Sequence, residues 1–358
     1  MAEHLLYCAA AGFEAARRLE RLAEGHRARR LHGHSFAARV RLALAPGRPG
    51  FPGDEVDALR RLLAQCVAPL EYQLLNDHLA SPSDESLAHW IRDRLALPTV
   101  DKLGVRSAPG TGVDLDRGGH THLWRRYAFE SAHRLPNVPP GHKCGRMHGH
   151  RFEVVLHAAA PGADHERLDA LWAPLGRELD RACLNDIEGL GNPTSELIGS
   201  WIWGRLKPGL PELSWVGVRE TASCGAHFDG VRYRIWKGMC LGSALRLARV
   251  PQGDARRRIH GHGYALRLHL QAPLDAVRGW TLDFGDVKEL FAPVFARLDH
   301  QPLYELPGLE DNDPASLLRW VRRECAGALP ALERIDLYES PGCGAILSWG
   351  ERAPALPV

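Results

Sequence analysis

The stretch FESAHRLPNVPPGHKCGRMHGH, residues 129–150, has two related copies elsewhere in the same chain. Counted back from each His-Gly-His, it aligns without a gap to FEAARRLERLAEGHRARRLHGH from Phe13 and to LGSALRLARVPQGDARRRIHGH from Leu241. A fixed internal repeat of this kind decides the architecture of a chain. The fold is therefore predicted from one unit that is used three times.

Each copy continues with the same pattern of elements. An alternating stretch follows the His-Gly-His (FAARVRLALAP, FEVVLHAAAP and YALRLHLQAP), and its period of two predicts a strand with one buried face. Two helical segments come next, and the second carries a tryptophan at matching positions, which we expect in the core: Trp90, Trp201 and Trp320. A strand and a glycine turn close each copy, as VRSAPGTG, VRETASCG and LYESPGCG. Each unit is thus an α+β arrangement of the order ββααββ.

The unit boundaries are predicted at two short joins. One lies near the glycine-rich DRGGH, residues 116–120, and the other near residues 236–238. These joins give three units, at residues 1–118, 119–237 and 238–358. Because the joins are too short to act as flexible linkers, we expect the units to pack directly against one another.

Composition favours a globular protein of more than one domain. The 358 residues exceed the size of most single cores, and 45% hydrophobic with 25% charged residues is ordinary for a soluble protein. A net charge of +2 argues against nucleic acid or a membrane surface as the main partner. The sequence shows no signal peptide or membrane span, and eight scattered cysteines indicate reduced thiols, so a cytoplasmic location is predicted.

The middle unit carries a set of metal-ligating side chains. His148 and His150, at i and i+2 of a strand, project from one face. His133 lies upstream, in the preceding strand of the predicted hairpin, and can supply a third imidazole. Three histidines with an open fourth position are typical of a catalytic zinc site. Cys144 is either a fourth ligand that makes the site structural, or a thiolate whose pKa is lowered by nearby positive charge.

The other two units lack this set. The position of His133 is Arg17 in unit one and Leu245 in unit three, and that of Cys144 is Ala28 and Arg256. Neither arginine nor leucine ligates zinc. The remaining His-Gly-His pairs of these units are therefore expected to serve packing or hydrogen bonding: His32, His34, His260 and His262.

FESAHRLPNVPPGHKCGRMHGH, LNDIEGLGNPTSE and VRETASCG resemble the 6-pyruvoyltetrahydropterin synthase family, and the Cys-x3-His-Gly-His spacing looks most like its bacterial 6-carboxytetrahydropterin synthase branch. The resemblance covers nearly all of unit two and, in degraded form, the whole chain. It implies the tunnelling fold, in which three units close an antiparallel β-barrel with the helices outside. One chain would form a pseudo-trimeric ring, and a homodimer would imitate the hexamer of the family.

The resemblance also implies a reaction and the residues that perform it. It implies that His133, His148 and His150 hold Zn²⁺, that Cys144 abstracts a proton, and that Glu220 grips the N–H groups of the pterin. The implied substrate is 7,8-dihydroneopterin triphosphate, converted to 6-carboxy-5,6,7,8-tetrahydropterin on the way to queuosine. Unit three keeps a matching Glu339, whereas unit one has Ser107.

One position departs from the family pattern. The family assists its cysteine with an Asp-His pair, but unit two reads Asp180-Arg181 there and unit one reads Glu71-Tyr72. Only unit three has the pair, as Asp299-His300. Since such sites form between neighbouring subunits in the family, we predict one composite site with metal and thiol from unit two and the pair from unit three.

Three other functions stay open from the sequence. The 6-pyruvoyl reaction shares the substrate, the metal and the fold. A pterin-binding protein without turnover is favoured by the loss of ligands in two units and by Arg181. A structural zinc protein would use Cys144 as its fourth ligand. Basic residues near the site could hold the triphosphate in the enzyme, namely Arg134, Lys143 and Arg146.

Overall fold

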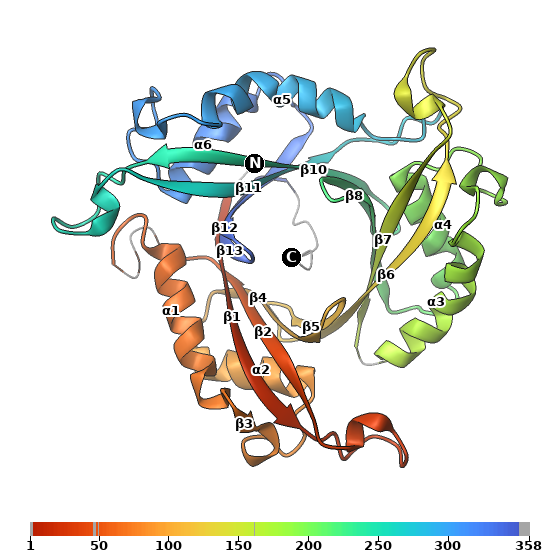
Figure 1. Ribbon diagram of the computed structural model, residues 1–358, viewed down its shortest axis with the longest axis horizontal. Coiled ribbons are helices and arrows are strands. Elements are labelled where there is room, and N and C mark those ends of the chain that lie inside the picture. The colour runs from red at the N-terminus through yellow and green to blue at the C-terminus, as the bar shows by residue number, and fades with distance from the viewer. Residues whose placement is uncertain (1–2, 46–47, 49, 161, 351–358) are drawn as a thin grey trace.

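Three units share one continuous sheet in the computed structural model, which describes residues 3–45, 48, 50–160 and 162–350. Figure 1 shows the strands arranged in a ring with the helices on its outer side. The predicted order ββααββ and the α+β barrel with external helices are confirmed in all three units.

The elements of the three units correspond one to one. Unit one contains β1 (His4–Arg17), β2 (His32–Leu42), α1 (Glu55–Val67), α2 (Asp84–Leu95), β4 (Val100–Ala108) and β5 (Thr111–Leu115). Unit two contains β6 (Thr121–His133), β7 (His148–Ala159), α3 (His165–Leu179), α4 (Ser195–Leu206), β8 (Leu213–Thr221) and β9 (Cys224–Phe228). Unit three contains β10 (Tyr233–Leu245), β11 (His260–Gln271), α5 (Phe284–Leu298), α6 (Pro314–Cys325), β12 (Leu332–Ser340) and β13 (Cys343–Ser348). A short strand β3 (Gln73–Leu74) adds to β1 in parallel.

The barrel closes between the last strand and the first. The strands β13 and β1 pair antiparallel from His4 opposite Ser348 to Cys8 opposite Gly344. Within the ring each unit joins the next through β5 with β6 and β9 with β10. Closure pairs both edges of every barrel strand, which leaves no row of unpaired backbone groups for aggregation.

The alternation of each strand separates two environments. In β7, Phe152, Val154 and Leu156 pack against the helices in the core of unit two, whereas Glu153 and His157 face the barrel interior. The helices cover only the outer face, so apolar residues collect there. Of the three predicted core tryptophans, Trp320 is fully buried, and Trp90 and Trp201 pack half-buried against the same cores.

The join between units two and three lies at residues 229–232, between the end of β9 and the start of β10. The boundary drawn after residue 237 falls inside β10, because Trp236 and Gly238 are mid-strand residues and not a turn. The first join, residues 116–120, does separate β5 from β6. Among the described residues no helix combines the length and apolar character needed to cross a bilayer.

Candidate metal centre

The β6–β7 hairpin brings the three predicted histidines together. His133 is directly opposite His148 in the antiparallel register, and Ser131 is opposite His150. Alternation then puts His148 and His150 on one face of β7. The hairpin register therefore accounts for the grouping of these three imidazoles.

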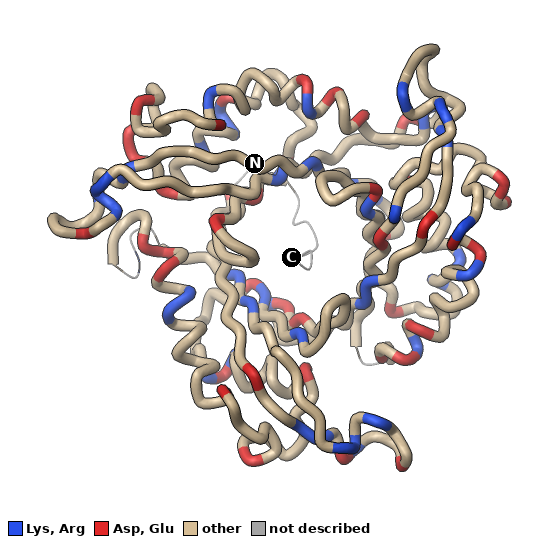
Figure 2. The backbone as a smooth tube through the Cα atoms, viewed as in Figure 1, with Lys and Arg blue, Asp and Glu red and all other residues tan. Residues whose placement is uncertain are grey.

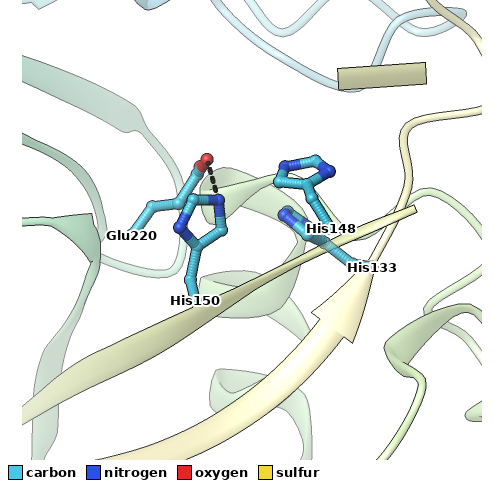
Figure 3. Close-up of side chains that lie close together, drawn as sticks. All are labelled: His133, His148, His150 and Glu220. Carbon is cyan, nitrogen blue, oxygen red and sulfur yellow. Dashed lines mark ion pairs between the residues drawn. The ribbon is translucent and has the colours of Figure 1, made fainter. Parts of the chain in front are cut away.

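A fourth side chain, Glu220 at the end of β8, completes the cluster (Figure 3). One ligand atom from each of His133, His148, His150 and Glu220 lies within 4.8 Å of all the others. His150 Nε2 is 3.1 Å from Glu220 Oε1. The sequence predicted Glu220 as a pterin-binding group, and its position as a possible ligand is new information from the structure.

The histidines are held with free nitrogens toward the cluster. His133, 1% exposed, donates from Nδ1 to the carbonyl oxygen of Pro193 at 2.9 Å, and its Nε2 is buried without a hydrogen-bond partner. His148 Nδ1 donates to the Arg146 carbonyl at 2.8 Å. Carbonyl partners of this kind fix the orientation of metal-ligating histidines. An unpaired buried nitrogen fits a missing cation, so these residues suit a divalent metal.

Glu220 remains ionised in this setting. Burial acts to raise the pKa of its carboxyl group, but the hydrogen bond and charge of His150 outweigh burial and hold the pKa below its ordinary value. Ser195 Oγ donates to Glu220 Oε2 at 3.1 Å. An ionised carboxylate at this place can either ligate a metal or accept hydrogen bonds from a substrate.

Cys144 lies beside the cluster and outside it. It sits in the short 3-10 helix η4 (Lys143–Gly145), half-buried, and its Sγ is not a member of the four-atom group. Burial and the carboxylates of Glu220 and Asp283 raise the pKa of the thiol. Nearby cations therefore do not bring the pKa of this thiol below its ordinary value, which the hypothesis of a thiolate requires.

An acid–base pair that the sequence did not suggest stands next to this cysteine. His142 accepts from the Cys144 backbone N–H through Nδ1 at 3.2 Å, and His142 Nε2 is 3.4 Å from Asp283 Oδ2. Asp283 caps the N-terminus of α5 in unit three. The sequence does show an acidic residue, Asp283, directly before a helix of the next unit. Its contact with His142 could not be predicted, because it depends on how the units pack.

Asp299 and His300 form the predicted pair, with Asp299 Oδ2 2.9 Å from His300 Nδ1. The side chain of His300 is 87% exposed, and among the described residues no contact joins it to Cys144. The Asp299-His300 pair and the turn after Glu220 lie along the same edge of β10. In that turn, the Ser223 carbonyl accepts from Gly238 N–H of β10 at 2.7 Å. His300 N–H donates to the Gly242 carbonyl, about 13 Å further along the strand.

The turn that carries His300 is a feature of every unit. His300, Arg181 and Tyr72 all have positive φ, at 55°, 58° and 54°. Each donates its backbone N–H to the first strand of its own unit. The conformation is therefore structural, and only unit three places an imidazole on it.

Unit one fills the corresponding place with an ion pair. Arg17 takes the position of His133, and its guanidinium donates to the Pro82 carbonyl at 3.0 Å and to Asp84 Oδ1 at 2.6 Å. Ser107, at the position of Glu220, donates to Asp84 Oδ2 at 2.8 Å. A protein cation thus stands where the middle unit has its histidine, which excludes a metal there.

Unit three also lacks a ligand set. Leu245 is buried at the position of His133, and Arg256, at that of Cys144, pairs with Asp254, Asp54 and Asp57. In the part of the chain that the structure describes, only the middle unit supplies a metal-type cluster.

The fold and the site together define a closed barrel of three ββααββ units with one three-histidine centre at the junction of units two and three. Residues 8–108, 122–231 and 235–349 each match the family of 6-pyruvoyl tetrahydropterin synthase. The chain belongs to this family, as a tandem repeat of its domain.

Individual relatives match between about a third and 60% of this chain. A 6-carboxy-5,6,7,8-tetrahydropterin synthase from Synechocystis is 35% identical over 123 residues, covering 31% of this chain and 94% of that protein. The structure of the Caenorhabditis elegans 6-pyruvoyl tetrahydropterin synthase matches 33% of this chain and 95% of its own at 17% identity, with a TM-score of 0.29. The uricase from Arthrobacter globiformis matches 60% and 80% at 10% identity, with a TM-score of 0.33.

Proposed function

We propose that this protein is a zinc-dependent 6-carboxy-5,6,7,8-tetrahydropterin synthase. It would act on 7,8-dihydroneopterin triphosphate and release acetaldehyde and triphosphate, as a step toward queuosine and other 7-deazaguanines. The observation that carries the proposal is the cluster of His133, His148 and His150 with Cys144 beside it, in a chain that is similar over 31% of its length to a synthase of that name. The eight free cysteines support a cytoplasmic location.

His133, His148 and His150 would hold the zinc ion, which supplies Lewis-acid polarisation of the substrate side-chain hydroxyls when bound. Glu220 would then be released from His150 and accept hydrogen bonds from the pterin ring. Its contact with Ser195 keeps the carboxylate oriented toward the site.

Cys144 would move protons along the substrate side chain. Two acid–base pairs that include residues of unit three could serve it. Asp283 contacts His142 of the cysteine loop, whereas Asp299 with His300 lies along the same edge of β10 as the turn after Glu220, about 13 Å further along the strand. We keep the Asp299-His300 pair as the proton relay, because an exposed imidazole can reach a bound substrate, and assign His142 to positioning the thiol.

The triphosphate would bind at the exposed edge of the same loop. Arg134, Lys143 and Arg146 are exposed, and none of them has an ion-pair partner among the described residues. Unpaired cations close to the metal cluster suit a polyanionic substituent.

The test combines zinc content with turnover of dihydroneopterin triphosphate by the purified protein. One zinc per chain with formation of acetaldehyde supports the proposal. His133→Ala should lose both metal and turnover, whereas Cys144→Ser and Glu220→Gln should keep the metal and lose turnover. Zinc loss in Cys144→Ser would favour a structural zinc protein.

Two alternatives are separated by the same assay. A product that keeps the three-carbon side chain, found by mass spectrometry, would indicate the 6-pyruvoyl reaction. Binding of the pterin without any product, unchanged by His300→Ala, would indicate a pterin-binding protein without turnover, which Arg181 in place of the family histidine favours.

We also propose a homodimer of two such rings. Each unit exposes an apolar residue directly before its His-Gly-His: Leu31, Met147 and Ile259 are 56%, 53% and 62% exposed. Because the units are equivalent, these three residues lie at corresponding positions around one end of the ring, one in each unit. A second ring stacked on this end would cover them.

A further inference from the structure

The barrel interior carries an uneven distribution of charge. Figure 2 shows several Lys and Arg positions along the inner wall, where β2 and β4 of unit one lie in Figure 1. Arg39 and Arg41 of β2 and Lys102 and Arg106 of β4 line one cavity there, together with Trp124 of unit two and Gly342 of unit three. This cavity is separate from the metal centre.

Acidic side chains of the protein neutralise only part of this positive charge. Arg41 is paired with Asp101 at 2.5 Å, and Lys102 is 2.7 Å from Asp114. Arg39 and Arg106 have no hydrogen-bond or ion-pair partner among the described residues, and the Arg39 Nε is buried and unpaired. Burial and repulsion by Arg106 lower the pKa of Arg39. Unpaired buried donors of this kind indicate a missing acceptor.

Each of the other two units carries one arginine at these positions instead of two. Arg219 of unit two, at the position of Arg106, pairs with Glu153 at 3.2 Å. Arg267 of unit three, at the position of Arg39, stacks on Trp236 with its Cζ 4.5 Å from the ring centroid. Two arginines side by side are therefore a property of unit one, because each of the other units keeps only one of the two.

The space beside them comes from a single replacement. The first strands of units two and three carry Trp124 and Trp236, which face the interior opposite His157 and His269. The corresponding residue of β1 is Cys8, opposite Arg41. A cavity of about 60 Å³ remains where an indole ring would lie, which exceeds the 10–15 Å³ or so that a single water needs.

We propose that this cavity binds a phosphate group, as inorganic phosphate or as a small phosphate ester, between Arg39 and Arg106. Guanidinium forks match phosphate oxygens in geometry and charge. The oxyanion supplies the acceptors that both arginines lack, and Trp124 and Gly342 bound the site. The inference goes beyond the proposed reaction and does not depend on it.

The test is calorimetric titration of the full-length, zinc-loaded protein with inorganic phosphate, and in a second series with glycerol 3-phosphate, at ionic strength held constant with chloride. Saturable binding of either probe is expected. Arg39→Gln and Arg106→Gln should each weaken it about tenfold or more, since each removes charge-assisted hydrogen bonds. Failure of both probes to bind the wild type would overturn the proposal.

Matched variants separate this site from other anion sites. Arg267→Gln removes the equivalent arginine of unit three and should leave phosphate binding unchanged. Cys8→Trp restores the residue of the other units and should abolish binding by filling the cavity. His133→Ala removes a metal ligand and should bind phosphate as the wild type does. Equal affinity in Arg39→Gln and wild type would contradict the proposal.

Discussion

Unit three, which lacks the metal ligands, keeps one acidic residue of the functional unit as Glu339. This residue occupies the position of Glu220, but without a histidine beside it burial raises the pKa of its carboxyl group to about 7. The unfolded chain ionises this group near its ordinary value of about 4.5, so ionisation inside the folded protein is unfavourable. Glu339 therefore lowers stability progressively as the pH rises from about 4.5 to 7, and the loss persists above pH 7.

We predict that Glu339→Gln raises the free energy of unfolding at pH 8 by up to about 3 kcal/mol and leaves it unchanged near pH 4. Urea unfolding at both pH values measures the difference. Glu130→Gln, at an exposed site, is the control and should change stability little at either pH. An equal effect of Glu339→Gln at both pH values would contradict this prediction.

The thiol of Cys144 provides a second measurement on a single residue. Because burial, Glu220 and Asp283 raise its pKa, Cys144 in metal-free protein should react with iodoacetamide several-fold more slowly at pH 7.5 than the exposed Cys240. Peptide mass spectrometry follows both sites in one sample. Asp283→Asn should speed the reaction of Cys144 and leave Cys240 unaffected; a faster reaction at Cys144 than at Cys240 in the wild type would refute the assignment.

At the scale of elements, glycine sets the spacing of the strands that close the barrel. A Cβ at Gly344 in β13 would collide with the backbone oxygen of Leu337 and lie 2.7 Å from the Cα of Tyr338. Since β13 is paired on both sides, the strand has no free direction in which to move.

Gly344→Ala should therefore lower the free energy of unfolding by about 1–3 kcal/mol. Gly263→Ala in β11 is the matched control, because nothing lies within 4 Å of a Cβ there. Thermal and urea unfolding of both variants gives the comparison. A stability of Gly344→Ala equal to that of Gly263→Ala would show that β13 can shift.

For the whole molecule, the exposed apolar residues of the ring predict a dimer. Aspartate in place of Leu31, Met147 and Ile259 together should convert a dimer of twice 39.6 kDa into a single chain, because three charges would be buried without partners. Light scattering after gel filtration measures the mass. Val231→Asp, 82% exposed in the turn between β9 and β10, should leave the mass unchanged. A wild-type mass equal to that of one chain would contradict the proposed homodimer.

The amino-acid sequence was enough to predict the three units, their ββααββ order and the grouping of His133, His148 and His150. These features follow from local periodicity and from the register of one hairpin, which depend on residues close in the chain. The boundary near residue 237 was misplaced because a tryptophan and a glycine inside a strand look like a join in the sequence.

The contacts between segments far apart in the chain appear only in the folded structure. It brought Asp283 to His142, Glu220 to His150, and Asp84 to Arg17, and it left Arg39 and Arg106 without partners. No local pattern encodes these contacts, because each joins segments far apart in the chain, and the contact of Asp283 with His142 also depends on how one unit meets the next in the closed ring.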